Sequence, residues 1–232
     1  MVNMSLNDIK RGVYLPKSES EQLAEFFGIL TGDGYMNCYN KCEYVIEIAG
    51  NKLLDKPYLF EYVASIIKDL FGVFPCLIER KDQNSIYLRI RSKAIYEYLL
   101  TKNFKSGRKE QIKIPNWVLK NERFLNYFIR GFFDTDGCIS IKNKEGGKYP
   151  TLSLSSKSYP LVNQLNRQIT SLKIPTCLIK DKRKDKRFTK ETTVYKLEIN
   201  GYNSIEKFMH IFGSSNKRNL AKFHEIKLTK KV

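Results

Sequence analysis

The segments FFGILTGDGYM (Phe26–Met36) and IRGFFDTDGCI (Ile129–Ile139) are two copies of one short pattern. Each copy is an apolar helical segment with an internal glycine, and each contains a small residue followed by Asp-Gly. Two further landmarks recur in the same order, namely Pro75–Ile78 with Pro175–Ile179 and Ile86–Ile90 with Tyr195–Ile199. Three ordered matches at an offset of roughly 100 residues predict that the chain contains a duplicated unit.

The hydrophobic pattern around each copy predicts the same order of elements, αββαββα. For the first copy we expect a helix from the capping box Ser18–Glu21 to Asp33, strands over 35–40 and 43–49, a helix over 59–70, strands over 74–81 and 85–91, and a helix over 94–100. For the second we expect a helix capped by Asn121, strands over 138–143 and 150–155, a helix over 161–172, strands over 176–181 and 192–199, and helices over 203–212 and 217–227.

The predicted fold class is therefore α+β, with two pseudo-symmetric αββαββα repeats. Residues 1–17 form an N-terminal extension, 18–100 the first repeat, 101–120 a linker anchored by Trp117, and 121–232 the second repeat.

The charge of the chain points to a polyanionic partner. Lys and Arg number 41 against 24 Asp and Glu, which gives a net charge of +17. No apolar run is long enough to predict a membrane span, and the N-terminal residues do not resemble a signal peptide. Five cysteines and two histidines lack the spacing of a disulfide framework or a zinc site.

Polar side chains alternate along the predicted strands, so that one face of each sheet is basic or hydroxyl-bearing. The alternating sets are Arg89 and Arg91, Lys142 and Lys144, and Thr151, Ser153 and Ser155. A two-stranded ribbon of this kind fits the major groove of DNA. A solvated sheet face would give the same alternation, but the net charge exceeds what solubility requires.

The two Asp-Gly helix ends predict a cation site. Small residues four apart, Gly28 with Gly32 and Gly131 with Thr135, would let the two helices pack closely. Their C-terminal ends would then bring Asp33 and Asp136 together at the negative ends of two helix dipoles. A hard divalent ion such as Mg²⁺ would offset that charge. A single Asp-Gly is usually only a helix stop, but its duplication favours the site.

The segments FFGILTGDG and IRGFFDTDG resemble the two motifs of LAGLIDADG homing endonucleases in their single-chain form, and the resemblance extends from Ser18 to Ile226. It implies motif helices packed at a central axis and hairpins forming a saddle over DNA. It also implies that Asp33 and Asp136 are the essential acids, that the carbonyls of Gly32 and Thr135 bind metal, and that Mg²⁺ is the cofactor, with Mn²⁺ able to substitute.

The sequence departs from the family pattern at two places. The sixth motif position is Thr31 in one copy and Asp134 in the other, and we expect Asp134 to be solvated or to cap a helix. The basic residue that the family places near each metal is not obvious. Lys93, Lys157 and Lys217 are candidates, and each could instead contact phosphate or lie on a solvated surface.

The predicted function is site-specific, metal-dependent DNA cleavage at a long asymmetric target. The chain would act on double-stranded DNA as a monomer, with no obligate protein partner and no membrane. It would act in the cytoplasm or an organellar matrix, and would not be secreted. An intron maturase or a non-cutting nucleic-acid-binding protein on the same fold is the alternative. A basic ribonucleoprotein component would explain the charge alone, and nothing marks the chain as intein-embedded.

The residues predicted to contact DNA come from the strands and hairpin turns. They are Tyr35, Asn37, Asn40, Lys41, Arg80, Lys81, Arg89, Arg91, Ser140, Lys142, Lys144, Ser153, Ser155, Lys180, Lys182, Lys184, Arg187 and Lys196. Because Tyr35, Asn37 and Arg89 would correspond to Cys138, Ser140 and Glu198 in the other repeat, the two halves should read different half-sites.

Overall fold

The computed structural model describes residues 2–81, 83–105, 107, 109–144, 147–184 and 191–229. The chain divides into two compact units, each built from two stretches of sequence. The first unit contains Met1–Gly107 and Pro115–Gly131, and the second contains Arg108–Ile114 and Phe132–Val232. The repeat boundaries given above are inferred from the duplication of the sequence, and they stay a prediction.

The first motif helix, α2 (Glu21–Asp33), begins with Ser20 as its N-cap. The Ser20 hydroxyl accepts a hydrogen bond from the Leu23 amide at 3.1 Å. The predicted cap, Ser18, was wrong, because Ser20 is the residue whose extended backbone places its hydroxyl over the first turn. Phe26 and Phe27 on this helix are fully buried.

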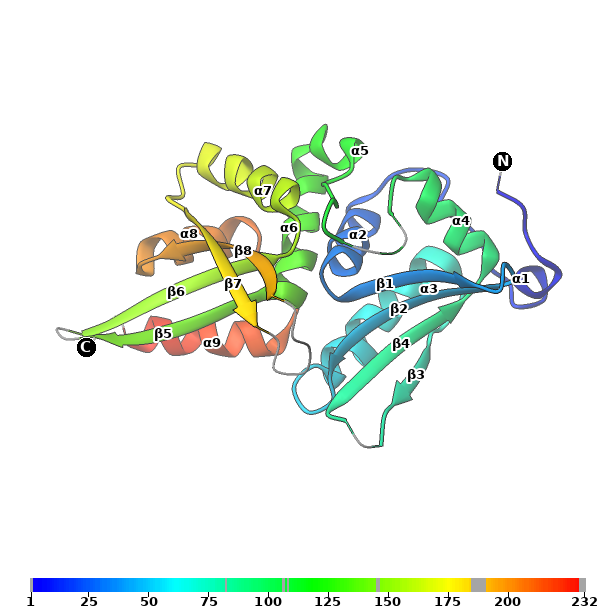
Figure 1. Ribbon diagram of the computed structural model, residues 1–232, viewed down its shortest axis with the longest axis horizontal. Coiled ribbons are helices and arrows are strands. Elements are labelled where there is room, and N and C mark those ends of the chain that lie inside the picture. Colours follow the sequence, from blue (N-terminus) through cyan, green and yellow to red (C-terminus); the bar gives the residue numbers. More distant parts are fainter. Residues whose placement is uncertain are drawn as a thin grey trace. The chain divides into compact units, whose positions relative to one another are not determined.

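Four antiparallel strands form the sheet of the first unit, in the order β1-β2-β4-β3 (Figure 1). The strands are β1 (Gly34–Tyr39), β2 (Glu43–Asn51), β3 (Cys76–Glu79) and β4 (Ser85–Arg91). Asn40 and Lys41 have positive φ angles of 50° and 60°, as expected for a tight hairpin turn. Both predicted hairpins are therefore present, although Asp82 in the second turn lies outside the described residues.

Helices cover one face of this sheet. The predicted middle helix is a π-helical segment, η1 (Tyr58–Val63), that continues as α3 (Ala64–Phe71) and ends at Gly72. The closing helix is α4 (Lys93–Thr101), which packs against β2 together with α2. The rings of Phe26 and Phe71 meet edge to face, with centroids 5.5 Å apart. These aromatic contacts hold α2, and therefore its C-terminal end, against the sheet.

The predicted linker contains a short helix, α5 (Asn116–Leu119), that belongs to the first unit. Trp117 anchors it as expected, since its ring lies 5.3 Å from that of Phe27 and its Nε1 donates to the Lys102 carbonyl. The second motif helix, α6 (Glu122–Asp136), follows, and Asn121 caps it by accepting from the amides of Arg123 and Phe124.

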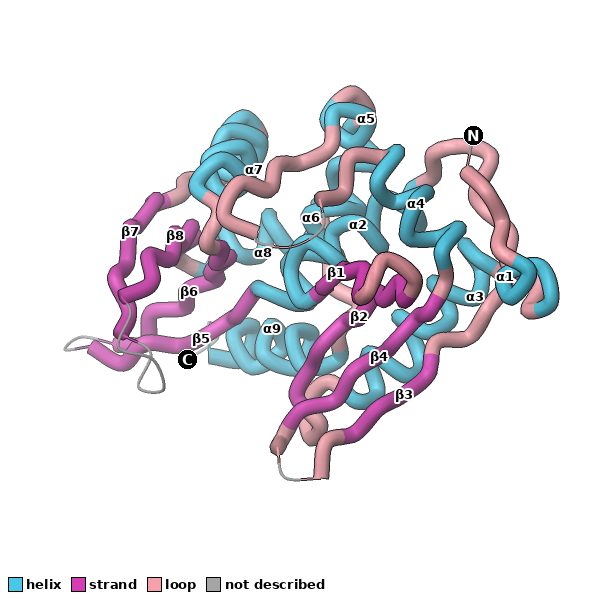
Figure 2. The backbone as a smooth tube through the Cα atoms, turned by 45° about the vertical axis from the view of Figure 1, so that its right-hand side comes forward, coloured by secondary structure: helices cyan, strands magenta, loops and turns pink. Residues whose placement is uncertain are grey.

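The sheet of the second unit has the order β5-β6-β8-β7, which repeats the order of the first. Its strands are β5 (Gly137–Lys144), β6 (Gly147–Ser156), β7 (Cys177–Lys184) and β8 (Glu191–Asn200). The helices α7 (Tyr159–Ser171) and α8 (Tyr202–Ile211) pack on β6 and β8, and α9 (Lys217–Thr229) packs along β5. In Figure 2 the strands of this sheet lie to one side of α7 and α8. The predicted α+β class and its two repeated halves are confirmed.

The N-terminal extension contains a short helix, α1 (Leu6–Lys10), which no sequence pattern predicted. The buried Asp8 carboxylate completes a capping box with Ser5 and also accepts from the amide of Ala94 at the start of α4. Burial would raise the pKa of Asp8, but the hydrogen bonds from Ser5, Ser92 and Ala94 together lower it below its ordinary value. Asp8 therefore ties the extension to the first unit.

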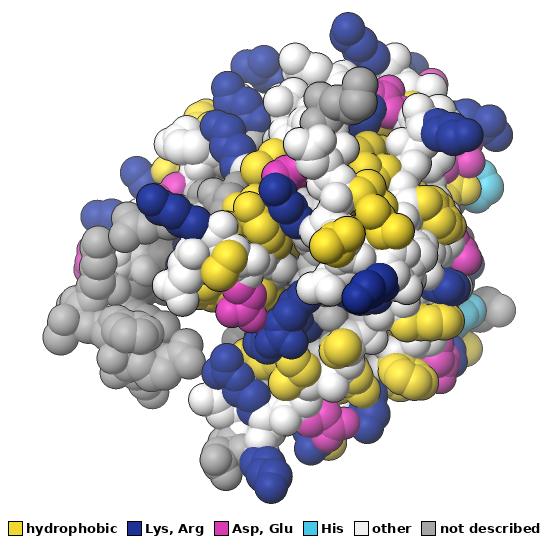
Figure 3. All heavy atoms as spheres, turned by 90° about the vertical axis from the view of Figure 1, so that its right-hand side faces the viewer, with side chains coloured by type: hydrophobic (Ala, Val, Ile, Leu, Met, Phe, Trp, Pro, Cys, Tyr) yellow, Lys and Arg dark blue, Asp and Glu magenta, His cyan; other side chains and the backbone are white. Residues whose placement is uncertain are grey.

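Among the helices of the described ranges, none is both long and apolar enough to cross a membrane. Basic side chains are more frequent than acidic ones on the face drawn in Figure 3, in keeping with the net charge of +17.

Candidate catalytic acids and nucleic-acid interface

The first candidate acid, Asp33, is the last residue of α2, and the strand β1 begins at the next residue. A Cβ atom built at Gly34 would overlap the backbone of Leu30, including its carbonyl oxygen. The glycine is therefore required because the chain turns directly from helix into strand with no space for a side chain.

The second candidate acid, Asp136, ends α6 in the same way. A Cβ atom at Gly137 would overlap the carbonyl oxygen of Phe133, which is again the residue four positions back. The Asp-Gly pair thus has the same structural meaning in both repeats. Each acid is partly exposed at a helix C-terminus. The meeting of Asp33 and Asp136 stays a prediction.

The prediction that Asp134 is solvated was wrong, whereas the alternative, that it caps a helix, agrees with its hydrogen bond from the Ser215 amide just before α9. Its side chain is only 1% exposed. The carboxylate accepts hydrogen bonds from the Ser214 hydroxyl, from the Ser215 amide at 2.8 Å and from the Asn219 amide group at 3.5 Å. The segment between α8 and α9 covers this carboxylate. The sequence carries no signal for this contact, because the partners are 80 or more residues away.

Close packing of α2 and α6 is observed within the first unit. A Cβ atom at Gly131 would overlap the carbonyl oxygen of Glu25. The predicted role of Gly131 as a small residue that permits helix contact is confirmed.

A partly buried ion pair that no sequence pattern predicted lies beside this contact. Arg130 donates to both carboxylate oxygens of Glu25, at 3.1 Å and 2.6 Å, and Tyr62 donates to the same carboxylate at 2.8 Å. The guanidinium also stacks on the Tyr127 ring, 4.1 Å from its centroid. Burial alone would lower the pKa of Arg130, but the hydrogen bonds and charge of Glu25 outweigh it and raise the pKa above its ordinary value.

The face of the first sheet opposite the helices carries the predicted reading residues. The strand register aligns Tyr35, Glu47, Arg89 and Cys76 across all four strands. Arg89 donates to Glu47 at 2.5 Å, and Arg91 donates to Glu43 at 3.0 Å. The two arginines are therefore held by neighbouring carboxylates, which the alternation of basic residues alone did not indicate.

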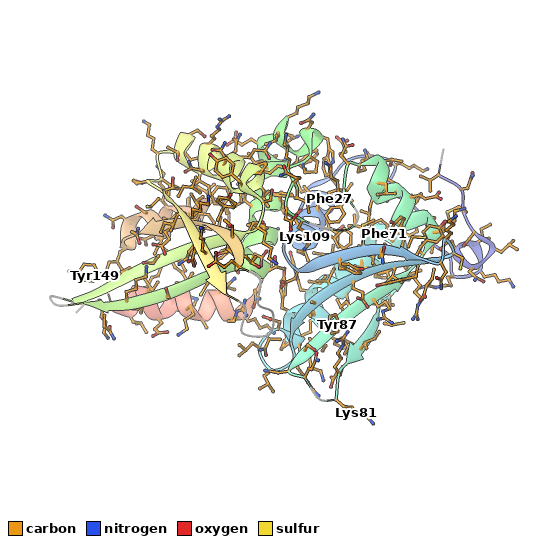
Figure 4. All side chains as sticks on the ribbon, viewed as in Figure 1. Phe27, Phe71, Lys81, Tyr87, Lys109 and Tyr149 are labelled. Atoms are coloured by element: carbon orange, nitrogen blue, oxygen red, sulfur yellow. The ribbon has the colours of Figure 1, made fainter. Side chains whose placement is uncertain are left out.

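The predicted hairpin residues lie at the ends of the strands. Asn40 and Lys41 form the β1–β2 turn, and Arg80 and Lys81 lie between β3 and β4. The Arg80 guanidinium stacks on Tyr87, 5.0 Å from the ring centroid. Figure 4 shows Lys81 at the outer tip of its hairpin.

The equivalent face of the second sheet has the same strand register as the first, but its central residue carries a negative charge where the first sheet has a positive one. Cys138, Ser153, Glu198 and Cys177 align across the strands, as Tyr35, Glu47, Arg89 and Cys76 do in the first sheet. The expected correspondence of Arg89 with Glu198 is confirmed by this register.

Two of the predicted DNA-contacting lysines hold this central carboxylate. Lys196 donates to Glu198 at 2.6 Å and Lys142 at 3.3 Å. The hydrogen bond from Lys196 contributes most to lowering the pKa of Glu198. Ser140, Ser153 and Ser155 share the same face by register.

The predicted basic stretch after residue 180 does not extend this face uniformly. Leu178 pairs with the buried Leu197, so Lys180 and Lys182, at alternate positions after Leu178, belong to the helix-covered side of the sheet. Ile179 pairs with Lys196 and belongs to the polar face. Lys144 and Lys184 are described only as strand backbone. Arg187 lies outside the described residues.

The three candidate lysines differ in their distance along the sheets from the acids. Gly34, the residue after Asp33, pairs with Ile48 at one end of β1. Lys93 begins α4 two residues after Arg91, and Arg91 pairs with Val45 toward the other end of the sheet. Lys93 therefore lies away from Asp33. It contacts Glu97, at 3.7 Å.

The other two lysines belong to the end of the second sheet that carries Asp136. Gly137 pairs with Leu154, three residues before Lys157. Lys217 begins α9, directly after the segment that binds Asp134.

Comparison with known proteins finds one family model that matches part of the chain. Residues 123–213 match the model of the LAGLIDADG-like domain. An uncharacterized protein of Methanocaldococcus jannaschii is 26% identical over 159 residues, which cover 67% of this chain. The chain spans 56% of the length of that protein.

Solved structures share the fold over most of the chain. A structure of mesophilic variants of the homing endonuclease I-DmoI has a TM-score of 0.57 and 21% identity, covering 83% of this chain and 95% of that one. The I-LtrWI LAGLIDADG homing endonuclease bound to target DNA has a TM-score of 0.54 and 14% identity, covering 90% of each chain. The predicted resemblance is confirmed, because residues 123–213 match the model of the LAGLIDADG-like domain and the chain shares the fold of these homing endonucleases.

Proposed function

We propose that this chain is a site-specific DNA endonuclease that makes a double-strand break at a long asymmetric target by metal-dependent hydrolysis. The observation that carries the proposal is the duplicated helix end, where Asp33 and Asp136 are each followed by a glycine that the close chain path requires. The fold it shares with I-DmoI, which was solved in complex with DNA and Mn, supports the same substrate.

The oxygen donors at each helix end suit a hard divalent ion such as Mg²⁺, for which Mn²⁺ could substitute. Asp33 and Asp136 would hold the ion with the backbone carbonyls of Gly32 and Thr135. Each carboxylate lies at a helix C-terminus, where the helix dipole already favours a cation. When bound, the metal would polarise the scissile phosphodiester and lower the pKa of the attacking water.

The chain itself would orient the DNA backbone and neutralise its charge. Water adds across one P–O bond in each strand, which leaves a hydroxyl and a phosphate monoester, and no covalent nucleophile is required. Lys157 and Lys217 are the candidate lysines at the Asp136 end of the second sheet, so we assign them phosphate contacts near the reaction.

The polar sheet faces would read the bases. Arg89 in the first sheet and Glu198 in the second occupy equivalent register positions with opposite charge, so the two half-sites should differ in sequence. Because both acids and both faces belong to one polypeptide, we propose that the protein acts as a monomer. We place its activity wherever the host DNA lies, in the cytoplasm or an organellar matrix.

Cleavage of a library of randomised duplexes by the purified full chain tests the proposal. With Mg²⁺ the chain should select and cut a long site, and excess EDTA should abolish cutting. Asp33→Asn and Asp136→Asn should each reduce double-strand cleavage by at least about 100-fold while target binding stays within about tenfold, since the carboxylates serve metal more than DNA.

A matched control is Asp69→Asn, which changes an exposed acid on α3 in the first unit. It should cut at the normal rate. Unimpaired cutting by either motif variant would refute the assignment of the acids. Tight DNA binding without any cutting would favour a non-cleaving nucleic-acid-binding protein.

A further inference from the structure

The C-terminal turn of α6 is bound by a segment from the far end of the chain. Ser214 and Ser215 donate to the Asp134 carboxylate, which is 1% exposed. Asn216 donates from its side chain to the Asp134 carbonyl at 3.0 Å, and Asn219 donates to the Phe133 carbonyl at 3.4 Å. The last carbonyls of a helix lack hydrogen-bond donors within the helix, and here side chains of the Ser214–Asn219 segment donate to them.

This arrangement also fixes the start of α9. The buried carboxylate of Asp134 accepts the Ser215 amide just before the first turn of that helix, where negative charge is favourable. Further along, Ile226 is 2% exposed, and α9 packs against β5, the strand that begins directly after Asp136. The helix is thus attached at the residues next to the second acid.

Lys217 lies between two residues of this attachment. Asn216 and Asn219, on either side of it, both bond to carbonyls of α6. The backbone of Lys217 therefore begins α9 at the end of α6 that carries Asp136.

The first repeat has a different residue at the equivalent position of its motif. The Thr31 hydroxyl donates to the carbonyl of Phe27 in its own helix, at 2.7 Å. A threonine has no carboxylate with which to accept several donors at once, so Thr31 cannot make the contact that Asp134 makes.

Resting on the proposed nuclease function, we propose that Asp134 is a positioning residue. Through the Ser214–Asn219 segment it holds Lys217 beside Asp136, where Lys217 binds the phosphate of one scissile bond. The ammonium group of Lys217 would bind that phosphate and stabilise the negative charge that develops on it. Cleavage of the two DNA strands would then depend on different basic residues.

The test is the rate of nicking of each strand, followed on a target duplex labelled on both strands. Asp134→Asn and Lys217→Met should each slow the nicking of the same single strand by about 10- to 100-fold, the usual effect of losing a supporting contact. The other strand should be cut within about threefold of the normal rate. The double variant should be no slower than Lys217→Met alone, since Asp134 acts through Lys217.

Two controls separate positioning from general damage. Thr31→Val changes the equivalent motif residue, and Lys222→Met changes another exposed lysine of α9, so neither should alter the ratio of the two strand rates. Ser214→Ala removes one donor to Asp134 and serves if Asp134→Asn fails to fold. Hydrogen exchange of the first α9 amides, measured without DNA, should rise in Asp134→Asn and not in Lys217→Met.

The outcomes distinguish this inference from the function on which it rests. If the unaltered chain cuts neither strand, both proposals fall. If it cuts both strands and the variants slow the two strands equally, or if the effects of Asp134→Asn and Lys217→Met multiply, only the positioning role is overturned. Unchanged hydrogen exchange in Asp134→Asn would also overturn it.

Discussion

The two repeats are alike where the backbone is tightest and different on the polar faces of their sheets. Both motif helices turn into a strand through a glycine whose Cβ atom would overlap the residue four positions back. In contrast, the central position of the polar sheet face is Arg89 in one unit and Glu198 in the other. The backbone path therefore restricts the residues it can accept, while the polar sheet face is free to diverge within the same register.

The ion pairs on the two faces extend this comparison. In the first sheet an arginine is held by one carboxylate, Glu47, whereas in the second a carboxylate is held by two lysines. Each charge is thus oriented before any partner arrives, but the central residues of the two faces carry opposite charges. A duplicated fold can in this way present two distinct surfaces for recognition.

The largest effect should come from the ion pair between α2 and α6 in the first unit. Arg130→Met leaves the Glu25 carboxylate, 2% exposed, without its bidentate partner, and should lower the free energy of unfolding by about 3–5 kcal/mol. Denaturant unfolding measures this. The double variant Glu25→Leu with Arg130→Met should recover much of the loss, and a double variant less stable than Arg130→Met would contradict this account.

The two helix-exit glycines should respond alike. Gly34→Ala and Gly137→Ala each force the backbone to move, and each should destabilise the chain by about 1–3 kcal/mol. Thermal unfolding of the two variants gives the comparison. Cys138→Ala, the exposed next residue of β5, is the control and should change stability by less than about 0.5 kcal/mol. A large effect at only one glycine would show that the two exits differ.

The two sheet faces should respond differently. Arg89→Ala should relax base preference in one half of the target, and Glu198→Gln in the other half, by about 1–3 kcal/mol at the contacted bases. Cleavage of every single-base variant of the target measures both profiles. If either substitution changed preference in both halves, the assignment of one half-site to each sheet would be wrong.

The smallest effect concerns the extension that only the first unit carries. Because the pKa of Asp8 is lowered on folding, its contribution to stability is complete above the unfolded pKa near 4 and is lost as the pH falls through the folded pKa. Asp8→Asn should therefore cost about 1 kcal/mol at neutral pH, and the difference from the unaltered chain should shrink below about pH 4. Urea unfolding across this pH range checks it, and a constant difference would exclude linkage through Asp8.

Much of the fold could be predicted because its signals are local. The hairpin turn at Asn40 and Lys41, the helix cap at Asn121 and the stop at Gly72 each depend on neighbouring residues. The Ser18 cap failed because two serines lie within one turn of the helix start, and only the backbone conformation decides which one caps it. Helix α1 was missed because a five-residue helix gives too short a pattern.

The candidate acids also could be predicted, because the duplicated Asp-Gly marks them directly in the sequence. What surrounds them could not be. Asp134 looked exposed because helical spacing turns it away from Asp136, and only the packing of a segment 80 residues later buries it. The same holds for Arg89 and Lys142, whose carboxylate partners lie on other strands and are reached only through the alignment of those strands.

The sequence by itself determined the duplication, the class of fold, the positions of the two acids and the excess of positive charge. These follow from residue type and short-range periodicity, which act within a few residues of chain. The tertiary structure alone decided the pairing of Glu25 with Arg130, the pairing of Arg89 with Glu47 and of Lys142 with Glu198, and the burial of Asp134. Each of these joins residues distant in sequence, and their contact depends on strand register and helix packing, which no local pattern encodes.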